Sequence, residues 1–223
     1  MFTVAKQFTG LTLTATANDS SVKLSSKGYE NITNQFMYNT GTGWQSYTLG
    51  TSIPLNNGQS CEIYCNAHPD TQTTSRRVGF DMTGTIEASG NCNSLLGGNF
   101  EGITAVPQYA FFCLFINCAS LTRAPEIPAT AVETSSYDSM FENCKALAQA
   151  PQLPATTLVY NCYQYMFSGC TSLTKAPELP ATVLKNTCYK VMFSGCSALT
   201  EVRIRATTMA SYALQDWLSG VAA

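Results

Sequence analysis

The sequence is poor in charge, in histidine and in long apolar segments. Only 12% of the 223 residues are charged and the formal net charge is −2, whereas about a quarter of a typical soluble domain is charged. We therefore expect no basic surface of the kind that binds nucleic acid. No segment reaches the roughly 18 consecutive apolar residues of a membrane-spanning helix, and residues 1–10 contain no apolar stretch of signal-peptide length. The sequence therefore predicts neither a membrane span nor an ordinary export signal.

Motifs for catalysis and for cofactor binding are also missing. The single histidine, His68, lies in a polar His-Pro-Asp segment, which is more typical of a turn than of a catalytic base. No Cys-x-x-Cys pair occurs, so a zinc site has too few ligands. Gly41 and Gly43 fall in a predicted hairpin rather than before a helix, which argues against a nucleotide site. We expect a protein that is not an enzyme and that has no cofactor and no metal.

What the sequence does have is a 26-residue repeat. Residues 140–165 match residues 166–191 at 13 of 26 positions. Such a period is typical of a stack of similar coils, in which each coil buries its apolar side against its neighbours. The residues that recur are therefore predicted to form the core: Cys118, Cys144, Cys170, Cys196, Phe141, Phe167, Phe193, Leu147 and Leu173.

The ten cysteines follow the same period rather than a disulfide or zinc pattern. One register of the repeat holds Cys92, Cys118, Cys144, Cys170 and Cys196. Residues in register stack about 4.8 Å apart with parallel side chains, a direction that does not favour a disulfide. Cys162 and Cys188 form a second register, in which the next member is the apolar Leu214. We expect buried, reduced thiols.

Residues 1–88 predict an antiparallel β-sandwich. Short stretches of alternating apolar and polar residues are separated by turn clusters. Asn39 to Gly43 favours a hairpin, because glycine supplies positive φ angles. The stretch 55–64 resembles the turn and strand of immunoglobulin-like modules. Residues 89–223 would form the second domain, which holds the repeat.

Each coil of the repeat predicts one extended segment and one helix. Residues 121–128, 147–154 and 173–180 read Leu-x-x-Ala-Pro-x-(Leu/Ile)-Pro, and proline keeps the backbone extended. Leu158, Cys162 and Met166 recur at every fourth position, which favours a helix of two or three turns. Residues 211–218 read as another helix. The predicted fold class is thus β-rich α+β, with an immunoglobulin-like sandwich followed by a leucine-rich-repeat solenoid.

The repeat resembles a known family. The pattern Phe-x-x-Cys-x-x-Leu-x-x-Ala-Pro-x-Leu-Pro is similar to the repeat of BspA-like leucine-rich proteins, and the similarity covers residues 92–222. It departs from the family in its Ala-Pro step and in the length of its coil. BspA-like proteins occur on bacterial surfaces and in phage tail or fibre proteins, so the resemblance implies recognition or assembly at a surface.

Candidate binding residues are the outward positions that differ between coils. Arg123, Gln149 and Lys175 share one register with Glu201, and Glu126, Gln152 and Glu178 share another with Ile204, on the expected concave face. Tyr160 and Tyr165 add exposed aromatic surface. Neutral drift between repeats would also explain this variation.

We expect a non-catalytic virion protein, such as a tail, fibre or decoration component, that binds other virion proteins or a host glycan or protein. A bacterial surface adhesin and a polysaccharide-binding accessory domain of an enzyme are the alternatives. Location in the virion or at the bacterial surface, and the formation of homo-oligomers, stay open.

Overall fold

The computed structural model describes residues 10–27, 36–66 and 77–221. His68 and residues 1–9, on which two of the expectations above depend, lie outside these ranges. Within them the chain is rich in strands, and its only helices are two short 3₁₀ segments, η1 (Cys92–Leu96) and η2 (Phe100–Gly102). The predicted β-rich fold is therefore confirmed, and its helical part is not.

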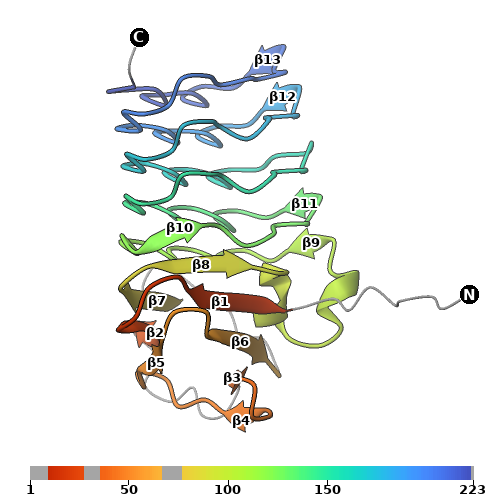
Figure 1. Ribbon diagram of the computed structural model, residues 1–223. Helices are drawn as coiled ribbons and strands as arrows, with labels where there is room; N and C mark the ends of the chain where they lie inside the picture. Colours follow the sequence, from red (N-terminus) through yellow and green to blue (C-terminus); the bar gives the residue numbers. More distant parts are fainter. Residues whose placement is uncertain (1–9, 28–35, 67–76, 222–223) are drawn as a thin grey trace, which may run out of the picture.

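Two sheets form the N-terminal part (Figure 1). The strands are β1 (Leu11–Ala15), β2 (Ser20–Lys27), β3 (Phe36–Asn39), β4 (Gln45–Ser46), β5 (Ile53–Leu55), β6 (Ser60–Cys65), β7 (Arg77–Thr83) and β8 (Ile86–Ser89). One sheet has the order β10-β8-β1-β6-β3-β4, and the other has the order β5-β2-β7. Every pair among β1–β8 is antiparallel. Apolar side chains of both sheets belong to one buried cluster, which forms because alternate residues of a strand face the same side.

The predicted hairpin is present between β3 and β4. The side-chain Oδ1 of Asn39 accepts hydrogen bonds from the backbone N–H of Gly41 (2.8 Å) and of Gly43 (3.1 Å). Both glycines have positive φ, 99° and 104°. This is a backbone conformation that residues with a Cβ rarely adopt. The turn places Trp44 at the surface, where 48% of the residue is exposed.

The C-terminal part is a stack of coils that continues from the sheets toward the C-terminus (Figure 1). We number the coils 1 to 5, for residues 92–117, 118–143, 144–169, 170–195 and 196–220. The strands within them are short: β9 (Ala105–Val106), β10 (Leu121–Arg123), β11 (Ala131–Val132), β12 (Val183–Leu184) and β13 (Thr208–Met209). Elsewhere single parallel bridges join the coils, as between Gln149 and Lys175. Prolines limit the strands because they cannot donate ladder hydrogen bonds.

The helix predicted in each coil is wrong: the segment is a ribbon of consecutive turns. In coil 3, Asn161, Tyr165 and Gly169 have positive φ, which no right-handed helix allows. The N–H groups of Gln164, Met166 and Ser168 bond to carbonyls three positions earlier, whereas those between them bond to the next coil. Residues 211–220 form the same ribbon. A ribbon that repeats every four positions buries the same stripe as a helix, so the sequence pattern did not distinguish them.

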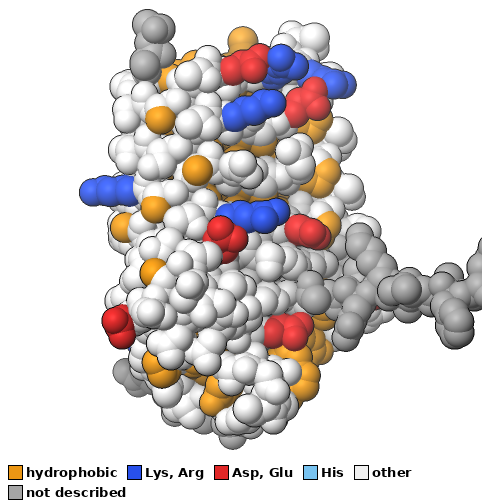
Figure 2. All heavy atoms as spheres, viewed as in Figure 1, with side chains coloured by type: hydrophobic (Ala, Val, Ile, Leu, Met, Phe, Trp, Pro, Cys, Tyr) orange, Lys and Arg blue, Asp and Glu red, His pale blue; other side chains and the backbone are white. Residues whose placement is uncertain are grey.

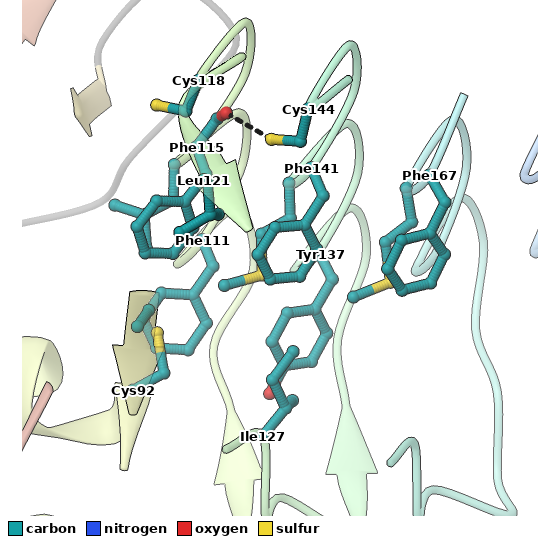
Figure 3. Packing of buried hydrophobic residues seen from close by; sticks show 14 of the residues in the cluster. Cys92, Phe111, Phe115, Cys118, Leu121, Ile127, Tyr137, Phe141, Cys144 and Phe167 are labelled. Carbon is teal, nitrogen blue, oxygen red and sulfur yellow. Dashed lines mark hydrogen bonds between the residues drawn. The ribbon is translucent and has the colours of Figure 1, made fainter. Parts of the chain in front are cut away.

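Stacked aromatic rings run through the coils. Phe115, Phe141, Phe167 and Phe193 lie nearly parallel, with centroids 5.4 to 5.6 Å apart. The rings of Phe115, Phe141 and Phe167 appear side by side in Figure 3. Phe80, on β7, extends the row: its ring stacks on that of Phe115 at 5.0 Å.

The sheets and the stack are joined directly. Strand β10 pairs in parallel with β8, and the backbone N–H of Phe80 donates to the carbonyl of Leu114. One buried apolar cluster extends from Leu11 to Ala213. The division into domains 1–88 and 89–223 stays a prediction.

The last coil is shorter than the others by a single position. The N–H of Tyr163 bonds to the carbonyl of Cys188, but the N–H of Tyr189, its equivalent in the next coil, bonds to Ala213 and not to Leu214. The residue above Cys188 is therefore the buried Ala213, and the expected register partner, Leu214, is displaced by one position. Because of the same shift, Ile204 pairs with Leu179 and not with Glu178.

Candidate functional site

The structure brings the two predicted registers together on one face of the stack. Parallel bridges join Arg123 to Gln149 and Gln149 to Lys175. The six predicted residues, Arg123, Gln149, Lys175, Glu126, Gln152 and Glu178, are all exposed. Between the two registers, each coil has an Ala-Pro step. Its fixed φ holds the two polar side chains of that coil apart along an extended segment.

Two adjoining hollows lie along this face, and we call them together the strip groove. The first, of about 440 Å³, is lined by Arg123, Glu126, Gln149, Gln152 and the Ala-Pro steps between them. The second, of about 500 Å³, is lined by Gln149, Gln152, Lys175, Glu178, Glu201 and Arg203. Both hollows share Gln149, Ala150 and Gln152, so they meet at coil 3.

The groove is charged at both ends and neutral in the middle. Figure 2 shows charged side chains near the C-terminal end of the stack and again lower down, with a mostly uncharged region between. At the upper end, Glu178 accepts from Arg205 and Glu201 accepts from Arg203, each at 2.6 Å. The bond to Glu201 raises the pKa of the Arg203 guanidinium. Among the described residues, Arg123, Glu126 and Lys175 take part in no ion pair, so their charges are available to a ligand.

Tyr160 is not part of the groove. It is 52% exposed, but it lines neither hollow. Its carbonyl accepts from Ser135 in the turn ribbon, away from the Ala-Pro segments. Tyr165, also in the ribbon, is partly buried.

The predicted core residues lie inside the stack. Cys118, Cys144, Cys170, Cys196, Phe141, Phe167, Phe193, Leu147 and Leu173 are each at most 1% exposed. All ten cysteines are free and buried. Burial raises the pKa of the Cys118 and Cys196 thiols to about 12. These thiols therefore stay protonated at neutral pH and are poor nucleophiles.

Two features were not expected from the sequence. Trp44 and Tyr64 pack edge to face, 6.3 Å apart, beside a hollow of about 400 Å³ that Met37 and Asn66 also line. The exposed Trp after the hairpin glycines was the available signal. The second feature is the buried carboxyl of Asp138, whose Oδ1 accepts from the Ser139 hydroxyl at 3.1 Å. Burial raises the pKa of Asp138 to about 7. No local pattern distinguishes it from an exposed turn residue.

The described residues contain little that suggests chemistry. No three His, Cys, Asp or Glu side chains gather there in a way that could hold a metal ion. None of the helices in these ranges has the length and apolar character needed to cross a membrane. Exposed cations, amides and carboxylates around an open groove are suited to non-covalent binding through hydrogen bonds and charge.

The comparisons with known proteins identify no family. No protein-family model matches the chain, and no curated protein and no solved structure shows significant similarity to it.

Proposed function

We propose that this chain is a non-catalytic recognition protein of a phage virion, such as a tail, fibre or decoration component, that binds a glycan or protein of the host surface through the strip groove. The observation that carries this proposal is the position of the groove. It lies on the face where the coils differ from one another, over segments whose buried residues recur.

The chemistry of the groove supports a polar ligand. Arg123 and Lys175 carry charges that are not in ion pairs, and the amides of Gln149 and Gln152 lie between them. An amide offers both donors and an acceptor, which suits hydroxyl groups or a peptide backbone. The Ala-Pro steps of the lining offer apolar surface to the same ligand.

The virion assignment is supported by the resemblance of the repeat to BspA-like proteins. We propose that each coil is a helix-free form of that leucine-rich repeat, with turns in place of the helix. The recurring Phe, Cys and Leu positions support this assignment, and the turn ribbon is the main departure. We also propose that β1–β8 form an immunoglobulin-like sandwich, since their two antiparallel sheets share one apolar cluster.

The test is attachment of the purified protein to host cells. The double variant Arg123→Ala/Lys175→Ala should weaken attachment at least about tenfold, because a charge-assisted hydrogen bond contributes about 1.5–3 kcal/mol. Lys145→Ala/Lys185→Ala removes the same charge from exposed positions outside the groove, so it should attach normally. Both double variants should melt near the wild-type temperature, because exposed substitutions cost under about 0.5 kcal/mol.

Three outcomes would contradict the proposal. Normal attachment of the groove variant, or equal loss in both double variants, would exclude the groove as the binding site. Hydrolysis of a host glycan that disappears with Glu126→Gln would replace the non-enzymatic assignment. Treating the cells with glycosidases or proteases before the assay distinguishes a glycan ligand from a protein ligand.

A further inference from the structure

The outer face of coil 5 has a row of unused backbone donors. In coil 4, the N–H groups of Tyr189, Val191, Phe193 and Gly195 donate to coil 5 carbonyls, at 2.7 to 3.1 Å. Allowing for the shorter last coil, the equivalent groups in coil 5 belong to Leu214, Asp216, Leu218 and Gly220. Within the described residues these four N–H groups donate to no backbone carbonyl. The N–H groups between them close turns inside the coil, as that of Trp217 does to Leu214.

This row repeats an interface that occurs four times lower in the stack. Coils 1 to 4 each donate four or five such bonds to the next coil. On the strand side the direction is reversed: Ala210 of coil 5 donates to Leu184 of coil 4. Each coil therefore offers the next one donors along its ribbon and acceptors along its strand. Coil 5 offers both sets outward.

The side chains around the row are apolar rather than protective. Met209 and Tyr212 are 62% and 64% exposed, and Leu214, Trp217 and Leu218 are only partly buried. Terminal repeats of stacked proteins usually have a polar outer face, because an apolar one promotes association. Edge strands are likewise usually protected by charge, which β13 (Thr208–Met209) lacks. We call this surface, from residue 208 to residue 221, the end face.

We propose that the end face is a docking surface for a polypeptide partner. The partner places a coil-like segment over coil 5, with carbonyl oxygens at alternate residues above the four donors and N–H groups above the strand side. This is the mode in which a backbone segment extends an existing edge. The inference is independent of the strip groove and of its ligand.

The hydrogen-bond direction decides between a different partner and a second copy of this chain. The matching underside of a coil is already covered in this protein, because Phe80 stacks under Phe115 and accepts from the Cys118 thiol. Two copies meeting ribbon to ribbon would place donors against donors. A coil-like segment of another polypeptide satisfies the row, and a second copy does not.

The probe is a synthetic peptide of residues 170–195. In the protein, this segment covers coil 3 in the required direction, with Tyr189 and Phe193 stacked on Tyr163 and Phe167. Added to the full chain, it should slow hydrogen exchange of the Leu214, Asp216, Leu218 and Gly220 amides at least about tenfold. A peptide with Tyr189→Ser and Phe193→Ser should protect none of them.

Protein variants give the matching control. Met209→Lys/Tyr212→Lys changes only exposed side chains of the end face and should abolish protection. Trp44→Lys changes an exposed aromatic residue of the β3–β4 hairpin and should leave protection intact. Slow exchange of the four amides in the chain alone, or no effect of the peptide, would overturn the proposal. Concentration-dependent self-association that protects the same amides would also overturn it, in favour of a homotypic interface.

Discussion

The thiol of Cys144 donates a hydrogen bond of 3.1 Å to the backbone carbonyl of Phe115, one coil below (Figure 3). Cys118, Cys170 and Cys196 make the equivalent bonds to Phe80, Phe141 and Phe167, at 3.0 to 3.2 Å. The cysteine register thus satisfies carbonyls that the turn ribbon leaves without a backbone donor. This role requires the reduced thiol.

We therefore predict that nearly all ten cysteines are free, as measured by thiol counting on denatured, non-reduced protein. Two or more disulfides among Cys92, Cys118, Cys144, Cys170 and Cys196 would refute this. Cys170→Ala should cost about 1–2 kcal/mol, as a small truncation in a packed core. Because burial raises the pKa of Cys118 and Cys196 to about 12, their contribution to stability is complete below about pH 8.5 and decreases as pH rises toward 12. Urea unfolding at pH 7, 9 and 10 measures this decrease.

Asp138 should make the protein more stable in mild acid than at neutral pH. Its pKa is raised to about 7 when folded, against 3.8 as the ordinary value, mainly by burial. The folded state therefore holds a proton that the unfolded state has lost between these values, and stability decreases as pH rises from about 4 to 7. Asp138→Asn should remove this dependence and raise the melting temperature at pH 8.

The matched control is Glu142→Gln, a partly exposed carboxylate one turn further along the ribbon, which should leave the pH dependence in place. Gln164 occupies the position equivalent to Asp138 in the next coil, which shows that a neutral amide is accommodated there. A flat stability profile for the wild type between pH 4 and 7 would contradict the assignment.

The row of stacked rings predicts how damage spreads. Phe115→Ala removes a ring between Phe80 and Phe141, and Phe193→Ala removes one farther from the sheets. Each should cost about 3–5 kcal/mol. Hydrogen exchange should show the first opening both β7 and coils 1–2, and the second opening coils 4 and 5 more than the sheets. If both variants open the whole chain equally, the division into two domains is wrong.

Val191 adopts a backbone conformation that does not suit it. Its φ is 57°, and a β-branched residue in the left-handed region is strained. Asn tolerates this region, so Val191→Asn should raise stability by about 0.5–1 kcal/mol, measured by chemical unfolding. Val159 is also partly buried but has no positive φ, so Val159→Asn should lower stability. Lower stability in both variants would show that lost apolar contact exceeds the relief of strain.

The repeat alone indicated the stack, its period and the residues inside it, because packing between similar neighbours requires the same apolar residue at the same place in every coil. Alternation along β1, β6 and β7 likewise indicated strands, and the glycines after Asn39 indicated the hairpin. The six groove residues could be named from the sequence, since outward positions are those free to differ.

Only the tertiary structure decided between helix and turn ribbon. Leu158, Cys162 and Met166 form one buried stripe in either case, and the choice depends on whether alternate N–H groups bond within the segment or to the next coil. That neighbour lies a whole coil further along the chain, beyond any local pattern. The same reason applies to Phe80, whose place under Phe115 depends on how β7 meets coil 1, and to Ala213, which lies above Cys188 because the last coil is shorter. Local spacing determined which residues are buried, and contacts between distant segments determined the backbone that buries them.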